Sequence, residues 1–279
     1  MSSDAQLSRG VSRLRECEQI WGSTLVQACG VSDVGRVRKT NEDTFVSDPE
    51  IRLFAVADGM GGHGAGEVAS RLAIDAITAF IRRSAADAEA SWPYGIDRAL
   101  SLDGNRLRTA IHLANRRIFR ASESHDEYNG MGTTIVGVLL IGSRVSVGNV
   151  GDSRVYLISN GAIEQLTQDD SWAATILARD LHLGPADIAT HPMRNVLTNV
   201  LGVREQVDIH LMERDLRDGE MLLLCSDGLH GVMDGEAIRT TVTAAPDVRA
   251  AAHQLVGTAL DRGSRDNVTA LVVQYAEDR

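Results

Sequence analysis

Apolar positions follow a strand pattern and then a helix pattern in the first third of the chain. Leu53–Ala57 is a continuous apolar run of the length of a buried strand, and a glycine-rich stretch follows it. Apolar residues then recur at helical spacing: Val68, Leu72, Ala76, Ile77, Phe80 and Ile81. A similar face over about 105–121 predicts a second helix. We therefore expect a strand, a tight loop and two amphipathic helices.

From about residue 133 the period changes to that of strands. Short β-rich runs separated by glycine-containing turns predict strands at Thr133–Ile141, Arg144–Val150, Arg154–Ser159, Ala162–Leu166, Met221–Cys225 and Asn267–Tyr275. Asn160-Gly161 predicts a tight hairpin turn. Val207, Ile209 and Leu211 alternate with polar residues and predict a half-exposed strand. A helix is expected over about 246–261, with Pro246 in its first turn.

The chain has no internal repeat and no long linker. Residues 1–22 are polar and predict an added arm, with helical character around Arg9–Glu18. Residues 23–279 predict one domain. Strand meanders with helices grouped beside them favour a layered α+β fold over a wound parallel sheet.

Composition narrows the class of protein. The chain has 279 residues, 43% of them hydrophobic, which suffices for a sizeable core. No apolar run approaches the roughly 18 residues that span a bilayer. A net charge of −10 argues against nucleic acid or an anionic membrane as partner. The three cysteines show no CxxC spacing, and we expect reduced thiols and a cytoplasmic protein.

Acidic residues stand at the ends of several predicted strands. Asp58 and Asp227 each follow an apolar run and precede a glycine, Asp152 lies between two strands, and Asp266 precedes the last one. Glu42-Asp43 adds two more acids. A single Asp-Gly after a strand is usually a turn, but repeated placement predicts that these acids converge on one edge.

Clustered carboxylates repel one another unless a cation joins them. Oxygen ligands suit Mg²⁺ or Mn²⁺, whereas the absence of HExxH, paired cysteines and a histidine cluster disfavours zinc. Two such ions sharing a carboxylate activate water. With Arg38 to hold a phosphate oxygen, the pattern predicts phosphate-ester hydrolysis.

A competing motif occupies the loop after the first strand. Gly59 to Gly64 matches the GxGxxG of dinucleotide-binding folds. However, Asp58 would place a carboxylate beside the pyrophosphate. The acid expected about 20 residues further on should also end a strand, yet Asp75 lies in a predicted helix. We therefore favour the metal site.

Six motifs occur in one order along the chain, and together they resemble a known family. They are Arg38-Lys39-Thr40-Asn41-Glu42-Asp43, Ala57-Asp58-Gly59-Met60-Gly61-Gly62-His63, Gly130-Met131-Gly132-Thr133-Thr134, Gly151-Asp152-Ser153-Arg154, Leu224-Cys225-Ser226-Asp227-Gly228-Leu229 and Asp266-Asn267-Val268-Thr269. This order resembles metal-dependent Ser/Thr protein phosphatases of the PPM (type 2C) family, in the bacterial variant. The resemblance covers roughly residues 28–275. It implies a four-layer αββα sandwich with two antiparallel sheets and a site for two Mn²⁺ or Mg²⁺ ions.

The resemblance also implies roles for single residues. Asp58 resembles the ligand that bridges the two ions, and Gly59 a backbone-carbonyl ligand of the second ion. Asp227 and Asp266 resemble the remaining ligands of the first ion. Glu42 and Asp43 match acids near the second ion, Asp152 matches the ligand of a third, weakly bound ion, and Arg38 matches the arginine that holds the phosphate.

The general acid departs from the family pattern. Eukaryotic members carry it two residues after the bridging aspartate, where this chain has Met60, and His63 is the nearest candidate. A structural role for this histidine stays open. The stretch 168–202 corresponds to the family's flap beside the metal site.

The resemblance implies an enzyme that removes phosphate from phosphoserine and phosphothreonine in proteins, opposing a Ser/Thr kinase. We expect a monomer whose partners are phosphorylated proteins. A catalytically weak binding module and a small-molecule phosphatase are the alternatives. The intact aspartates argue against the first alternative.

Overall fold

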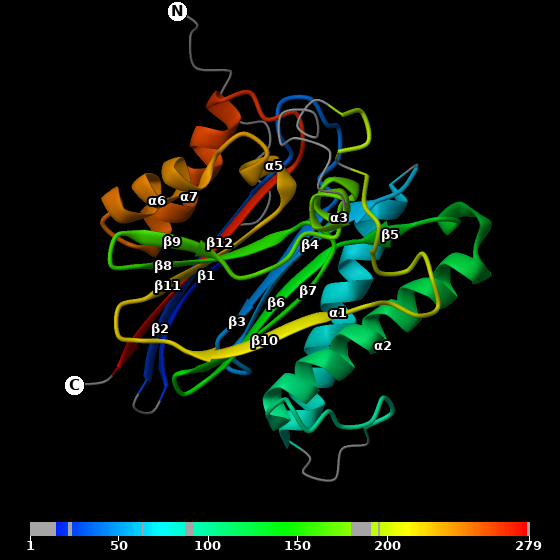
Figure 1. The fold of residues 1–279 in the computed structure, drawn as a ribbon, viewed down its shortest axis with the longest axis horizontal. Coiled ribbons are helices and arrows are strands. Elements are labelled where there is room, and N and C mark those ends of the chain that lie inside the picture. Colours follow the sequence, from blue (N-terminus) through cyan, green and yellow to red (C-terminus); the bar gives the residue numbers. More distant parts are fainter. Residues whose placement is uncertain are drawn as a thin grey trace, which may run out of the picture.

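Two antiparallel sheets form the centre of the molecule (Figure 1). The structure is a computed structural model that describes residues 15–21, 24–62, 64–86, 92–179, 191–194 and 196–277. The first sheet has the order β1 (Arg15–Trp21), β2 (Thr24–Asp33), β12 (Val268–Glu277), β11 (Met221–Cys225), β8 (Arg154–Ser159), β9 (Ala162–Gln165). The second has the order β10 (His210–Asp215), β7 (Arg144–Val150), β6 (Ile135–Ile141), β4 (Leu53–Met60), β3 (Asp43–Asp48), with β5 (Gly132–Thr133) paired to β4.

Helices cover the outer face of each sheet (Figure 1). The second sheet is covered by α1 (Ala65–Ala86) and α2 (Leu102–Ser124), and the first by α6 (Gly235–Ala244) and α7 (Val248–Asp261). Shorter helices lie in the connections: η1 (Asp126–Tyr128), α3 (Trp172–Arg179) and α5 (Asp227–His230). The αββα sandwich that the resemblance implied is therefore confirmed.

Three hydrophobic clusters fill the spaces between the four layers. Alternate residues of a strand point to opposite faces of its sheet. In β4, Leu53 and Ala55 therefore pack toward α1 and α2, while Phe54 and Val56 pack between the sheets. All four side chains are fully buried, which explains why the sequence of a central strand reads as a continuous apolar run.

Several predicted elements are confirmed with small changes at their ends. The Asn160-Gly161 turn has a positive φ at both residues, 49° and 75°, as a tight hairpin requires. The second predicted helix begins three residues early, because the Ser101 hydroxyl accepts a hydrogen bond from the Gly104 N–H and caps α2.

Three local expectations were wrong. Residues 15–21 form β1, where a helix was expected; this edge strand pairs with the next strand, β2, and its mostly polar residues do not show the apolar pattern of a buried strand. The strand expected from Val207 begins only at His210, because Val207 packs in the core against the helices before the chain pairs with β7. Pro246 precedes the Asp247 cap of α7 and lies outside its first turn.

No helix within the described ranges is both long and apolar enough to cross a bilayer.

Candidate metal centre

The predicted acidic residues come together at one end of the sandwich. Because neighbouring strands are antiparallel, β3 begins where β4 ends, and Asp43 pairs directly with Asp58. In the first sheet, Cys225 at the end of β11 pairs with Arg154 on one side and Ala270 on the other. This register brings the residues just outside those strands, Asp152, Asp227 and Asp266, to the same sheet end.

Asp43 joins the two sheets at this end. It belongs to the second sheet, yet its Oδ2 accepts hydrogen bonds from the Ser226 hydroxyl at 2.8 Å and the Thr269 hydroxyl at 2.6 Å, both from the first sheet. A second bridge runs from Ser153 to Thr134, whose Oγ1 accepts a hydrogen bond from the Asp58 N–H. The position of the acids therefore depends on how the sheets pack together.

Burial, followed by mutual repulsion, raises the pKa of four of these carboxyl groups, those of Asp43, Asp58, Asp152 and Asp227. Burial is the largest cause for Asp58, followed by the negative charges of Asp43, Asp227, Asp152 and Asp266 in that order, and its pKa lies well above the usual range. Burial also raises the pKa of Asp43 and of Asp152 to about 7 each. Because the charges of the other four acids all act on the pKa of Asp58, the five acids share one electrostatic environment.

The donor atoms fit a hard divalent cation. The Oδ1 atoms of Asp43 and Asp227 are buried without a hydrogen-bond partner among the described residues, which is costly for a carboxylate unless another group satisfies it. All the donors are oxygens, as Mg²⁺ and Mn²⁺ prefer. Over the described residues, no three acidic, histidine or cysteine side chains approach closely enough to hold an ion alone. Water would therefore complete the coordination, as is usual for Mg²⁺.

Arg38 lies at the open side of the acidic cluster. Its Nη2 donates a hydrogen bond to Asp266 Oδ2 at 2.7 Å, and half of its side chain is exposed. This hydrogen bond is the main reason that the pKa of Arg38 is raised. The neighbouring Glu42 is half-buried, and burial raises its pKa while the charge of Arg38 lowers it. Arg38 therefore presents a half-exposed guanidinium beside the acids.

Glycines let two backbone segments touch beside Asp58. A Cβ on Gly59 would lie 2.0 Å from the carbonyl oxygen of Gly66, and one on Gly66 would lie 2.8 Å from Glu42 Cδ. The Gly59 N–H donates to the Glu42 carbonyl at 3.1 Å. These glycines serve close packing, and β4 lies in an antiparallel sheet, so the dinucleotide-binding alternative is wrong.

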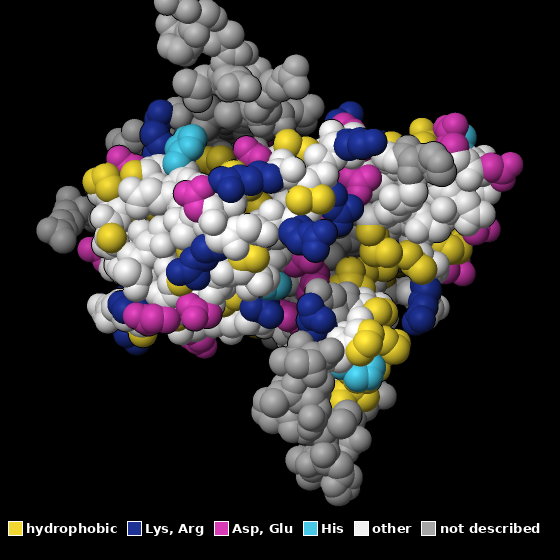
Figure 2. All heavy atoms as spheres, turned by 90° about the horizontal axis from the view of Figure 1, so that it is seen from above, with side chains coloured by type: hydrophobic (Ala, Val, Ile, Leu, Met, Phe, Trp, Pro, Cys, Tyr) yellow, Lys and Arg dark blue, Asp and Glu magenta, His cyan; other side chains and the backbone are white. Residues whose placement is uncertain are grey.

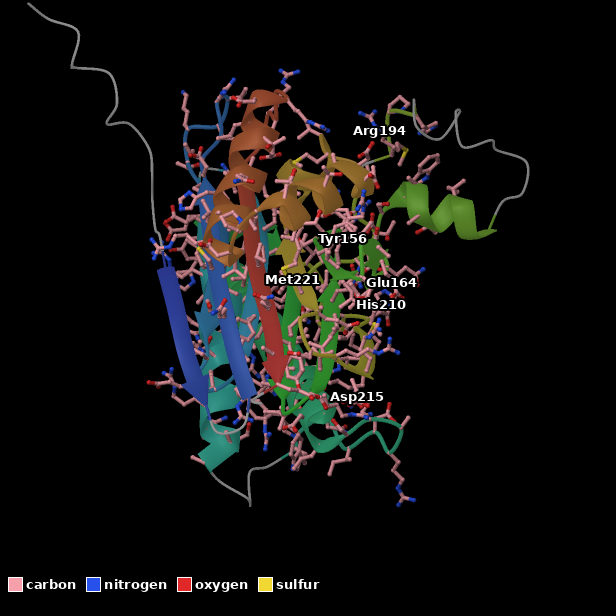
Figure 3. The ribbon with its side chains drawn as sticks, turned by 90° about the vertical axis from the view of Figure 1, so that its left-hand side faces the viewer. Tyr156, Glu164, Arg194, His210, Asp215 and Met221 are labelled. Atoms are coloured by element: carbon pink, nitrogen blue, oxygen red, sulfur yellow. The ribbon has the colours of Figure 1, made fainter. Side chains whose placement is uncertain are left out.

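The turn that carries Asp152 is held by a residue that sequence reasoning missed. Asp170 Oδ2 accepts hydrogen bonds from the Gly151 N–H and the Asn199 side chain, and its Oδ1 lies 2.8 Å from His210 Nε2. His210 opens β10, nearer than Asp215 to the end of the molecule where Arg194 lies (Figure 3). Asp170 thus connects the turn before Asp152 both with Asn199 and with the start of β10.

Other residues that support the site belong to the six motifs, although their supporting role was not predicted. Asn267 Oδ1 accepts from the Glu42 N–H, and its Nδ2 donates to the carbonyls of Val34 and Thr40. Ser226 and Thr269 support Asp43 in the same way. Their place beside Asp227 and Asp266 was the available signal, but their partners lie more than 180 residues away along the chain.

His63 lies outside the described residues, so its predicted role as a general acid remains a prediction.

Comparison with known proteins identifies the class. A profile described as "Protein phosphatase 2C" matches residues 36–262, and the chain belongs to this family. It is 37% identical over 246 residues to the serine/threonine protein phosphatase PstP of Mycobacterium tuberculosis H37Rv, covering 88% of this chain. It spans 44% of that relative, less than half its length. It is 33% identical to the serine/threonine phosphatase stp of Listeria monocytogenes EGD-e, covering 87% of this chain and 93% of that one.

Solved structures share the fold. A crystal structure of the M. tuberculosis phosphatase PstP/Ppp matches with a TM-score of 0.77 at 35% identity, covering 90% of this chain and 99% of that one. The catalytic domain of PstP, in complex with two manganese ions, matches with a TM-score of 0.75 at 34% identity, covering 91% of this chain and all of that one.

Proposed function

We propose that this protein hydrolyses phosphoserine and phosphothreonine in other proteins, using two Mn²⁺ or Mg²⁺ ions. The observation that carries the proposal is the convergence of Asp58, Asp43, Asp227, Asp152 and Asp266 at one sheet end, with Arg38 exposed beside them. Membership of the protein phosphatase 2C family and the manganese ions bound to the PstP catalytic domain support it.

Each residue has a role in this proposal. Asp58 would bridge the two ions, Asp227 and Asp266 would complete the first site, and the Gly59 carbonyl, Glu42 and Asp43 would serve the second. Asp152 would hold a third ion weakly. Bound there, two such ions would lower the pKa of a water between them and stabilise the charge that develops on phosphate.

The remaining groups of the chain would act on the substrate. Arg38 would exchange its hydrogen bond to Asp266 for one to a phosphate oxygen and hold the phosphate in line with the attacking water. His63 would donate a proton to the departing serine oxygen. No covalent phosphoenzyme is required. We also propose that the enzyme opposes a Ser/Thr kinase as a cytoplasmic monomer; the buried thiols of Cys29 and Cys225 fit a reducing compartment.

The test is hydrolysis of p-nitrophenyl phosphate and of a phosphoserine peptide with and without Mn²⁺. We expect both substrates to be cleaved only with the metal. Asp227→Asn should abolish both activities, because it removes one negative charge from the metal site while keeping the shape. Asp126→Asn, the same change at an exposed position, serves as the control.

Different results contradict different parts of the proposal. Metal-independent turnover would exclude a metal centre, and substantial activity of Asp227→Asn at saturating Mn²⁺ would contradict its role as a ligand. Faster hydrolysis of sugar phosphates than of phosphopeptides would favour a small-molecule phosphatase. No hydrolysis of any substrate would favour a binding module.

A further inference from the structure

An apolar groove lies directly beside the acidic cluster. It has a volume of about 410 Å³, and its lining includes the apolar side chains of Met60, Val196 and Val203 and the charged side chain of Arg204. Met60, Val196 and Val203 are 39%, 47% and 45% exposed, which is unusual for large apolar side chains so close together. Seen from this end, hydrophobic side chains gather beside Lys and Arg side chains (Figure 2).

One wall of the groove is connected to the metal centre through β5. The Thr133 hydroxyl and the Thr134 N–H both donate to the carbonyl oxygen of Asp58. On the other side of β5, Thr133 and Leu201 exchange two backbone hydrogen bonds, of 3.1 and 2.9 Å. These hydrogen bonds fix the position of Asp58 relative to the segment that carries Val203. Met60, two residues after Asp58, already belongs to the groove.

The same wall is built to be rigid. Buried Asn115 accepts a hydrogen bond from the Gly202 N–H and donates to the carbonyls of Arg204 and Glu205. Gly202 has a φ of +90°, and a Cβ there would lie 2.2 Å from Ile118 Cγ2. A buried amide and a required glycine thus hold the loop in a shape that points Val203 and Arg204 outward. Such preorganisation lowers the entropic cost of binding.

The electrostatics of the groove differ from those of the whole protein. The chain has a net charge of −10, yet the Arg204 side chain is exposed and has no hydrogen-bond or ion-pair partner among the described residues. Arg38 lies next to Asp266 of the acidic cluster, with half of its side chain exposed. A ligand of this groove would therefore combine an apolar side chain with negative charge.

We propose that the groove binds the polypeptide segment next to the phosphorylated residue of the substrate. An apolar side chain of the substrate would fill the space between Met60 and Val203, and an acidic side chain would pair with Arg204. This inference rests on the proposed function, since the phosphorylated residue must occupy the metal centre for its neighbour to reach the groove. It adds a sequence preference that the acidic cluster alone does not supply.

The test measures kcat/KM with Mn²⁺ for phosphoserine peptides in which a single leucine, or a single aspartate, replaces glycine in turn on either side of the phosphoserine. For the wild type we expect a leucine preference of about tenfold or more at one position, the order of effect that an apolar pocket gives. Val203→Ser should remove most of the leucine preference. The wild type should also prefer aspartate to glycine at a position next to the phosphoserine, and Arg204→Glu should reverse that preference.

Matched controls separate the groove from general effects. Ile96→Ser changes another exposed apolar residue, and Arg117→Glu makes the same charge change on the exposed side of α2. Both should keep the wild-type preferences. Thermal unfolding of every variant checks that the fold is intact, and the glycine peptide reports on the metal centre of each.

Two kinds of failure are distinguishable. Equal kcat/KM for leucine and glycine peptides in the wild type, or an equal loss of preference in Ile96→Ser and Val203→Ser, would overturn the groove proposal and leave the phosphatase activity standing. If the wild type cleaves neither p-nitrophenyl phosphate nor the peptides, the proposed function is wrong, and this inference falls with it.

Discussion

Arg38 and Arg36 are two residues apart, and the structure gives them different surroundings. Arg38 donates to Asp266 in the acidic cluster, whereas Arg36 pairs with Asp261 on the surface, where both side chains are largely exposed. An exposed ion pair contributes little to stability. The comparison of these two arginines therefore isolates a role in phosphate binding from a general loss of positive charge.

We expect Arg38→Ala to lower kcat/KM for a phosphopeptide by roughly ten- to 150-fold. A hydrogen bond to a charged group contributes about 1.5–3 kcal/mol, which corresponds to this range. Steady-state kinetics at saturating Mn²⁺ measure it, and Arg36→Ala should behave like the wild type. An effect of equal size in both variants would show that Arg38 has no specific role.

His63→Ala distinguishes a proton donor from a structural loop residue. A serine alkoxide is a strong base and needs a proton as it leaves, whereas p-nitrophenolate leaves without one. We expect phosphopeptide hydrolysis to slow by about 10²-fold, within the usual range for general-acid catalysis, and aryl phosphate hydrolysis to change little. Equal losses on the two substrates would mean that His63 only supports the glycine loop.

At the scale of elements, Glu213 on β10 connects the start of α2 to the second sheet through hydrogen bonds. Its buried carboxylate accepts hydrogen bonds from the N–H and hydroxyl of Ser101, the capping residue of α2, and from the Ser146 hydroxyl of β7. Burial alone would raise the pKa of Glu213, but these hydrogen bonds outweigh it and lower the pKa to about 2. The ionised carboxylate therefore stabilises the fold.

We expect Glu213→Gln to lower the free energy of unfolding at pH 7 by about 1–3 kcal/mol, because an amide cannot accept all these bonds. Since the pKa is lower in the folded state, the stabilisation is present above the ordinary pKa of glutamate and is lost as the pH falls toward 2. The difference between wild type and variant in urea unfolding should shrink over that interval. Glu164→Gln, at an exposed glutamate paired with Arg214, should change stability little.

At the scale of the whole molecule, the candidate metal centre lies where the two sheets meet. Asp43 of one sheet bonds Ser226 and Thr269 of the other, and the carboxylates around it repel one another. A bound cation would satisfy the buried carboxylate oxygens from both sheets at once. Metal binding and stability of the sandwich should therefore be linked.

Mn²⁺ should raise the unfolding temperature of the wild type by about 5–10 °C at a hundredfold excess over its Kd, because binding then adds about 2.7 kcal/mol and each kcal/mol shifts the midpoint by about 2–4 °C in a domain of this size. Calorimetry with Mn²⁺ and with a chelator measures this. The shift should be much smaller in Asp58→Asn and unchanged in Asp126→Asn. An equal shift in all three proteins would place the stabilising ion elsewhere.

The sequence by itself determined the central strands, the main helices and which acidic residues come together at one end of the sheets. Buried strands such as Leu53–Ala57 are apolar on both faces, and amphipathic helices repeat every three to four residues. Turn chemistry also shows locally, as at Asn160-Gly161. The ordered motifs carried the family resemblance, because several of them place an acidic residue at the end of a predicted strand.

Only the tertiary structure decided how these residues act together. The hydroxyls that support Asp43 come from segments about 180 residues or more away along the chain, and Asp170 connects the turn before Asp152 with residues on separate later segments. Such contacts follow from the packing of one sheet on another, and a local pattern of apolar and polar residues does not encode them. The exposed groove beside Met60 is of the same kind, since Val203 reaches it only because Asn115 and Gly202 hold its loop in place.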